Sequence, residues 1–158
     1  MRLYLVRHGD AVSKETDPTR PLSDPGRACV RRLGTFLAGS GVQVARVIHS
    51  GKRRAAETAE LLAPHVCPSG HVDEVTGLGS MDPVAPFARA INDWTDDTVV
   101  VSHLPFIGSL LSQLVIGNDA ASTVLFQTAT VVCLARTEDQ TWTILWALSP
   151  ELLVPPAK

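Results

Sequence analysis

The sequence predicts an α/β fold: a three-layer α/β/α sandwich with a mostly parallel central sheet and no cap domain. Apolar strand-like runs alternate with amphipathic helical stretches, which is the pattern of such folds. The run VVVS at 99–102 lacks polar alternation, as expected for a strand covered on both faces. A length of 158 residues corresponds to one domain. We expect this domain over residues 1–150 and a C-terminal tail over 151–158.

Each element is expected from its residue pattern. Strands are predicted at six apolar runs: 2–6, 45–49, 72–75, 98–102, 123–135 (with a break) and 141–148. Helices are predicted where apolar residues recur at helical spacing: 24–38, 52–63, 83–92 and 105–116. Ser23 marks the start of the first helix, and Gly39-Ser40-Gly41 marks its end. The last two strands have no helix between them, so we expect an antiparallel edge to the sheet.

Composition narrows the classes of function. A net charge of −2 with 19% charged residues predicts no broad nucleic-acid surface, so any anion site must be local. The longest apolar run, near 98–101, is far too short for a membrane span, and the first residues lack the features of a signal peptide. Three cysteines without a CxxC motif favour a reducing compartment. We therefore expect a cytoplasmic protein.

Polar residues follow three of the predicted strands: Arg7-His8-Gly9, His49-Ser50-Gly51 and Ser102-His103. Ligands of open α/β sheets bind outside the carboxyl ends of the strands. Parallel strands would bring all three groups to one edge of the sheet. That edge is the predicted functional site.

The stretch SGKRRAAETAELL, at 50–62, has an unusual distribution of charge for a helix start. We expect Ser50 to be the N-cap, which places Lys52, Arg53 and Arg54 in the first turn. The helix dipole disfavours cations there, by about 0.3–1 kcal/mol each when exposed. These side chains are either solvated and screened by salt, or they hold an anion together with the free backbone amides.

The residue types predicted at this edge indicate phosphoryl transfer. Two histidines, His8 and His103, lie with at least two arginines, and no nucleophilic Ser or Cys motif accompanies them. A histidine can act as a covalent nucleophile. Arginines bind phosphoryl oxygens in a bidentate manner and remain charged in the transition state. The chemistry predicted is therefore transfer of a phosphoryl group to His8.

Four motifs carry a resemblance to a known family: RHGDA, RPLSDPG, SGKRRAAETA and SHLPFIG, in this order over roughly residues 2–149. Together they resemble the histidine phosphatase superfamily, which has the phosphoglycerate mutase-like fold. The short chain and the RPLSDPG motif are similar to the SixA-type phosphohistidine phosphatase branch of that superfamily. The resemblance implies a metal-independent enzyme with no cofactor.

The resemblance also implies roles for individual residues. His8 would be the nucleophile, transiently phosphorylated, and three residues would complete the phosphate pocket: Arg7, Arg54 and His103. Three more would contact the substrate: Arg20, Gly9 and the backbone amide of Leu104. This sequence departs from the family at Gly51, where proline is usual. A change in the stiffness of that loop could alter how Arg54 is held.

No motif identifies a general acid. The candidates are Asp10, beside the dyad, and Asp82, with Glu74, Asp93, Asp96 and Asp97 as further carboxylates. An alkoxide leaving group needs such an acid, typically worth about 10²–10⁴-fold, whereas the imidazole of a protonated phosphoramidate needs it much less. A missing acid therefore favours phosphohistidine as substrate. The short segment between the third and fourth strands also favours an open site that admits a protein surface.

The function expected is removal of phosphate from a phosphohistidine-bearing protein. The alternatives are a phosphomonoesterase acting on a small phosphorylated substrate and a phosphate-recognition module without turnover. Neither a nucleic acid nor a membrane is an expected partner. A metal site at His65, Cys67 and His71 is a weak alternative, because no fourth ligand follows at the usual zinc spacing.

Overall fold

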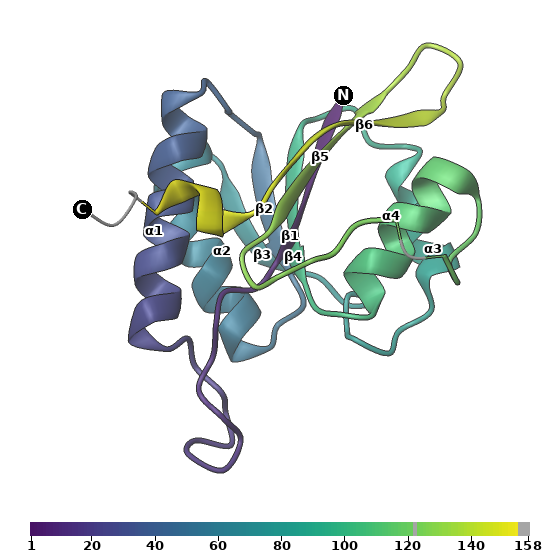
Figure 1. Cartoon of the computed structure of the whole chain (residues 1–158). Helices are drawn as coiled ribbons and strands as arrows, with labels where there is room; N and C mark the ends of the chain where they lie inside the picture. Colours follow the sequence, from purple (N-terminus) through teal and green to yellow (C-terminus); the bar gives the residue numbers. More distant parts are fainter. Residues whose placement is uncertain (122, 155–158) are drawn as a thin grey trace.

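The computed structural model describes residues 1–121 and 123–154, and within them it contains a six-stranded sheet and four α-helices (Figure 1). The strands are β1 (Arg2–Arg7), β2 (Arg46–His49), β3 (His71–Glu74), β4 (Thr98–Ser102), β5 (Val131–Arg136) and β6 (Trp142–Leu148). The helices are α1 (Asp24–Gly39), α2 (Arg53–Val66), α3 (Val84–Ile91) and α4 (Phe106–Ile116). None of these described helices is long and apolar enough to cross a membrane.

The strand order is β3-β2-β4-β1-β5-β6. The first four strands in this order pair in parallel, whereas β5 runs antiparallel to β1 and β6 runs antiparallel to β5. The prediction of a mostly parallel sheet with an antiparallel edge is therefore confirmed. Because β1, β4 and β2 are neighbours, their carboxyl ends lie side by side.

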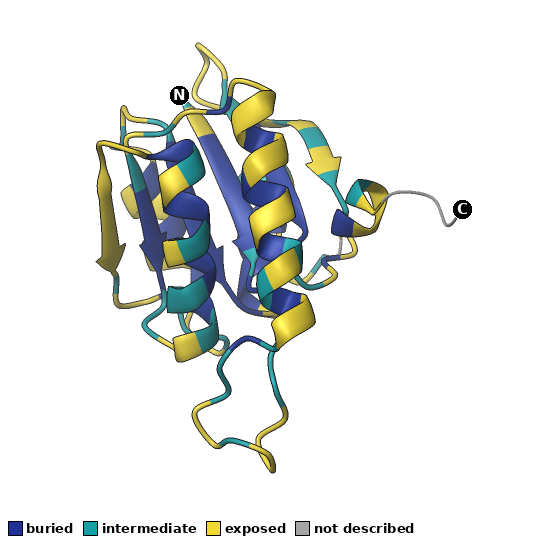
Figure 2. Cartoon of the chain, turned by 90° about the vertical axis from the view of Figure 1, so that its left-hand side faces the viewer, coloured by how far each residue is buried: buried dark blue, intermediate teal, exposed yellow. Residues whose placement is uncertain are grey.

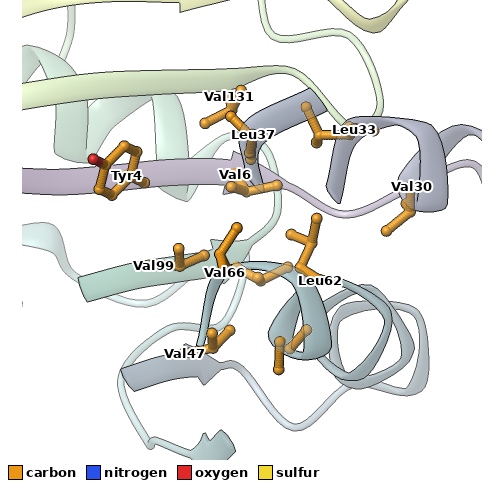
Figure 3. Close-up of a cluster of buried hydrophobic side chains, with 14 of the residues drawn as sticks. Tyr4, Val6, Val30, Leu33, Leu37, Val47, Leu62, Val66, Val99 and Val131 are labelled. Atoms are coloured by element: carbon orange, nitrogen blue, oxygen red, sulfur yellow. The ribbon is translucent and has the colours of Figure 1, made fainter. Parts of the chain in front are cut away.

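Helices cover both faces of the sheet, with α1 and α2 on one side and α3 and α4 on the other (Figure 1). Tyr4, Val6 and Val99 point toward α1 and α2, where they pack with Leu33 and Leu62 (Figure 3). The alternate strand residues, such as Leu5 and Val100, pack on the other face against α3 and α4. Figure 2 shows the central strands buried while the outer faces of α1 and α2 are exposed. This arrangement confirms the three-layer sandwich.

The helix boundaries follow the predicted signals at α1 but not at α2. Ser23 caps α1 by accepting a hydrogen bond from the Gly26 N–H at 3.0 Å, and the helix ends at Gly39. The predicted cap of α2, Ser50, is wrong: α2 begins at Arg53, and Lys52 stands at its N-cap without a side-chain hydrogen bond. Ser50 is therefore free to bond elsewhere.

The predicted strand at 123–135 is only partly correct, because β5 begins at Val131. The preceding residues cross the end of β1 as a loop. In this loop the Ala129 N–H lies 3.0 Å from the Arg7 carbonyl oxygen and 3.1 Å from that of His8. Phe126 is buried at the same place. The apolar residues before Val131 thus close the site, whereas those from Val131 onward form the strand.

The chain after β6 partly packs on the domain. Pro150–Leu153 forms a short 3₁₀ helix, and Leu153 contacts the core on the α1 side of the sheet. The rest of the predicted tail, 155–158, lies outside the described residues.

Candidate active site

The polar residues that follow β1, β2 and β4 meet at one edge of the sheet, as predicted. The backbone of His8 is held to β4 by a hydrogen bond of 3.0 Å from its N–H to the Ser102 carbonyl oxygen. His103 follows Ser102, and the ring centroids of His8 and His103 are 5.0 Å apart. Ser50, at the end of β2, reaches the same place from the other side of β4.

The His8 ring has a defined orientation. Its Nδ1 lies 2.7 Å from the Gly9 carbonyl oxygen. Because a carbonyl only accepts, Nδ1 carries the proton and Nε2 holds a lone pair. Burial, together with the charges of Arg54, Arg7 and Arg20, lowers the pKa of His8 to about 4. At neutral pH, His8 is thus an uncharged ring with an available nucleophilic nitrogen.

Three arginines lie near the His8 ring, and the charge of each lowers the pKa of His8. The Nε–H of Arg54 points at His8 Nε2 from 3.2 Å. Arg7 is oriented by its Nη1, which donates to the Phe126 carbonyl oxygen at 2.8 Å. Burial lowers the pKa of Arg54, and the charges of Arg20 and Arg7 lower it further. Three guanidinium groups gathered beside one neutral histidine form a site for an anion.

Arg20 reaches the site from the long loop between β1 and α1. Its Nε donates to the Val12 carbonyl oxygen at 3.1 Å, and its N–H donates to the Asp17 carbonyl oxygen at 2.9 Å. Its φ of 48° lies in the left-handed region, which non-glycine residues seldom adopt. Strain of this kind is concentrated at functional sites.

His103 is almost completely buried, with 1% of its surface exposed. Its Nε2 lies 2.5 Å from the Ser50 hydroxyl oxygen. Burial lowers the pKa of His103 to about 3, with further contributions from His8 and the cations Arg54, Lys52 and Arg7. His103 is therefore also neutral at physiological pH.

Thr58, which the sequence reasoning missed, ties the nucleophile loop to α2. Its buried hydroxyl donates to the Arg54 carbonyl oxygen at 2.7 Å and accepts from the Gly9 N–H at 3.0 Å. A polar residue within the apolar stripe of a helix was the available signal. The Gly9 N–H is thus occupied, and a Cβ on Gly9 would lie 2.8 Å from a methyl group of Val30. The structure thus gives Gly9 a packing role, and its contact with the substrate stays a prediction.

Glu57, also missed, joins α2 to the loop that carries Arg20. Its carboxylate accepts from the Leu22 N–H at 2.8 Å, from Arg27 Nη2 at 2.9 Å and from Arg53 Nε at 3.0 Å. Burial opposes its charge, yet these three donors hold the pKa of Glu57 below its usual range. Arg53, one of the three cations expected in the first turn of this helix, thus pairs within the protein.

Replacing Glu57 with glutamine preserves its size and removes the charge that both arginines share. We expect the free energy of unfolding to fall by about 1–3 kcal/mol. We also expect the KM for a phosphorylated substrate to rise severalfold with little change in kcat. The loop that carries Arg20, an expected substrate contact, is held less firmly without the Glu57 charge. Urea denaturation and steady-state kinetics measure the two effects, and Glu60→Gln, on the exposed face of the same helix, is the control. An unchanged KM in a destabilised Glu57→Gln protein would contradict the role of this loop.

Gly51 has a structural reason to differ from the family pattern. Its φ of +84° is unavailable to proline, and a Cβ would collide with the Glu74 carboxylate. The Gly51 N–H also donates to His49 Nδ1 at 3.1 Å, which gives His49 a structural role. The turn between β2 and α2 is therefore built on glycine.

Neither predicted acid is hydrogen-bonded to the histidine pair. The Asp10 carboxylate accepts from the Ser23 hydroxyl at 2.6 Å, and that of Asp82 accepts from the Gly79 N–H at 2.7 Å. Both are thereby directed to local backbone or cap positions. Leu104 follows His103 directly and is 40% exposed beside the site.

The weak alternative of a metal site gains no support. Among the residues that the structure describes, no three His, Cys, Asp or Glu side chains are placed to hold a metal ion. The ring of His65 packs over Gly34, and Cys67 is buried.

The geometry defines a class of site: a neutral histidine beside arginines, which is an arrangement suited to a phosphoryl group. Residues 3–78 match the family described as the histidine phosphatase superfamily (branch 1). Phosphohistidine phosphatase SixA of Escherichia coli (strain K12) is 30% identical over 155 residues, which cover 95% of this chain and 94% of that protein. This chain therefore belongs to the histidine phosphatase superfamily.

Solved structures agree with this assignment. The protein histidine phosphatase SixA complexed with tungstate superposes with a TM-score of 0.86 at 25% identity, covering 98% of this chain and 100% of that one. A structure from Agrobacterium tumefaciens has a TM-score of 0.77 at 21% identity, covering 94% and 97% of the two chains. The second similarity, at its lower identity, establishes the fold alone.

Proposed function

We propose that this protein is a metal-independent phosphohistidine phosphatase that hydrolyses a protein phosphohistidine through a covalent phospho-His8 intermediate. The observation that carries the proposal is the His8 ring itself. Its Nδ1 proton is held by the Gly9 carbonyl oxygen, and its Nε2 faces the Arg54 guanidinium. The phosphohistidine phosphatase of Escherichia coli, similar over almost the whole chain, supports the same substrate class.

The reaction takes two displacements at phosphorus. In the first, the His8 Nε2 lone pair forms a bond to phosphorus while the P–N bond of the substrate breaks, and the substrate imidazole leaves with a proton. In the second, water attacks phosphorus, the bond to Nε2 breaks and inorganic phosphate leaves. Arg7, Arg20 and Arg54 would neutralise the phosphoryl oxygens in both transition states. His8 returns to its neutral form.

The position of the carboxylates favours a nitrogen leaving group over an alkoxide. Asp10 accepts from the Ser23 hydroxyl and Asp82 accepts from the Gly79 N–H, and neither carboxylate is hydrogen-bonded to His8 or His103. A phosphomonoester needs a proton donor at its leaving oxygen, an effect of about 10²–10⁴-fold. A protonated phosphoramidate supplies a good leaving group without one. This supports phosphohistidine over an ordinary phosphate ester.

The surroundings of the site support a protein substrate. Leu104 and Leu125 are 40% and 82% exposed, and Phe126, next to Leu125, supplies the carbonyl that holds Arg7. Exposed apolar side chains beside a reactive centre are typical of contact with another protein. We further propose a cytoplasmic location, because the three free cysteines favour a reducing compartment.

The test offers the EDTA-treated protein a phosphohistidine-bearing domain and p-nitrophenyl phosphate side by side. We expect phosphate release from the domain to exceed release from the ester by about 100-fold or more in kcat/KM. Brief incubation with the domain labelled in its phosphoryl group, followed by alkaline quenching, preserves the acid-labile phosphoramidate. The labelled phosphoryl group should then be found on His8. His8→Ala is the control and should lose both activities and the label.

The other outcomes distinguish the alternatives. Equal or faster hydrolysis of the ester would show a small-molecule phosphomonoesterase. Phosphate binding without release from either substrate would show a recognition module. Activity that survives in His8→Ala would overturn the proposed nucleophile.

A further inference from the structure

Ser50 has an unusual position for a residue that precedes a helix. It lies between β2 and α2, yet its hydroxyl does not cap α2. Its partner is instead the ring of His103, which follows the neighbouring strand β4. The positive φ of Gly51 turns the chain directly after Ser50. The local backbone thus presents this hydroxyl to the active site rather than to the helix.

The two nitrogens of the His103 ring have different surroundings. Nε2 contacts the Ser50 hydroxyl oxygen at 2.5 Å. Nδ1 is buried and has no hydrogen-bond partner among the described residues, although the ring lies against that of His8. A buried polar nitrogen without a partner is costly unless a ligand satisfies it. Nδ1 is therefore the nitrogen that remains for a phosphoryl group on His8.

The direction of the Ser50 bond decides what Nδ1 can do. A neutral imidazole carries one proton, so a donor at one nitrogen is matched by an acceptor at the other. Burial of His103, together with the cations around it, keeps the ring neutral, with a pKa of about 3. If Nε2 donated to Ser50, Nδ1 would direct a lone pair at the phosphoryl oxygens, which only accept. If Ser50 donates to Nε2, Nδ1 carries the proton that those oxygens need.

We propose that Ser50 is a positioning residue: its hydroxyl donates to His103 Nε2 and fixes the Nδ1–H tautomer, through which neutral His103 donates a hydrogen bond to the phosphoryl group. The kinetic part of this inference rests on the proposed function, whereas the tautomer does not. Ser50 acts through His103 and does not itself contact the substrate. The arrangement supplies a donor at neutral pH without adding a fourth cation to the site.

The tautomer is measurable directly. The ¹⁵N chemical shifts of the two ring nitrogens, and their couplings to the ring protons, distinguish Nδ1–H from Nε2–H in ¹⁵N-labelled protein. We expect His103 to be Nδ1–H in the wild-type protein at pH 7 and to become a mixture of tautomers in Ser50→Ala. The His103 signals are assigned by their loss in His103→Gln. Ser50→Thr, which keeps the hydroxyl, should restore the wild-type tautomer.

Kinetics provide the second readout. We expect Ser50→Ala to lower kcat by about 10- to 100-fold, because one aligned donor to the transferring group is lost. Ser50→Thr should recover most of this loss. Ser80→Ala, a serine on the same rim that contacts Lys52 instead of a histidine, is the matched control and should behave as wild type.

Two results would overturn the inference: an Nε2–H tautomer in the wild-type protein, or an unchanged tautomer and kcat in Ser50→Ala. If Ser50→Ala fails to fold, its NMR spectrum loses the dispersed methyl signals, and Ser50→Thr is then measured in its place. A wild-type tautomer and kcat in Ser50→Thr support the inference. Loss of either in a folded Ser50→Thr protein opposes it. If the protein proved inactive on phosphohistidine, the tautomer measurement would still decide the role of Ser50. The two proposals therefore fail separately.

Discussion

Replacing Arg54 with alanine is expected to lower kcat/KM for phosphohistidine hydrolysis by about 10²- to 10³-fold. The change removes the guanidinium whose Nε lies 3.2 Å from His8 Nε2. It thus removes both a ligand of the phosphoryl oxygens and the donor that orients the nucleophile. Arg54→Lys should recover little of the loss, because an ammonium keeps the charge but lacks the planar fork.

The same substitution has a second consequence at His8. The charge of Arg54 is one of the causes that hold the pKa of His8 near 4, after burial and beside Arg7 and Arg20. Without it, that pKa rises toward the ordinary value of about 6.5. A protonated Nε2 has no lone pair, so the acid limb of the kcat/KM profile should move to higher pH in Arg54→Ala.

The control for Arg54 is Arg31→Ala, on the exposed face of α1. We expect its pH profile and kcat/KM to match those of the wild-type protein. A full loss of activity in Arg54→Ala with no movement of the acid limb would mean that Arg54 binds phosphate without tuning His8. Retention of wild-type kcat/KM in Arg54→Ala would remove Arg54 from the site altogether.

The convergence of His8 and His103 could be predicted from the sequence for a physical reason. Each follows an apolar run, and such runs form buried parallel strands whose carboxyl ends share an edge. The observed parallel pairing of β1 with β4 agrees with this expectation. The prediction needed only the positions of the strands and their direction, and the apolar runs in the sequence predict both.

The residues that support the pair could not be predicted in the same way. Ser50 precedes a helix and has the chemistry of a cap, but its partner is His103, 53 residues further on. Glu57 similarly bonds to Leu22, 35 residues before it. Such partners depend on which strands and loops are neighbours in space. The spacing of apolar residues predicts the strands and helices themselves, but not which of them lie side by side.

The run at 123–135 shows a related limit. Buried residues such as Phe126 make it apolar, and apolar runs of this kind are found both in strands and in loops that close over a core. Here the first part crosses the end of β1, where the Phe126 carbonyl receives a hydrogen bond from Arg7. The contact with the site, rather than strand pairing, decides its conformation.

The neutral histidine pair predicts how stability depends on pH. His8 and His103 have pKa values of about 4 and 3 in the folded protein, and about 6.5 when unfolded. At a pH between the folded and unfolded pKa values, the two histidines are protonated in the unfolded chain but not in the folded protein. The free energy of unfolding should therefore be constant above about pH 7 and fall as the pH drops below 6.5. Well below 6.5, each histidine contributes a slope of about 1.4 kcal/mol per pH unit.

Urea denaturation between pH 7.5 and 5.0 measures this slope before carboxylates such as Glu57, whose pKa is lowered in the folded protein, begin to add their own loss. We expect His8→Gln to remove about half of the slope between pH 6 and 5. His71→Gln, which removes an exposed histidine of β3, is the matched control for the substitution itself. A wild-type protein whose stability does not change between pH 7 and 5 would show that the pair takes up protons in the fold. The nucleophile would then have to lose a proton before each attack, and the acid limb of kcat/KM would lie near pH 6.5 instead of 4.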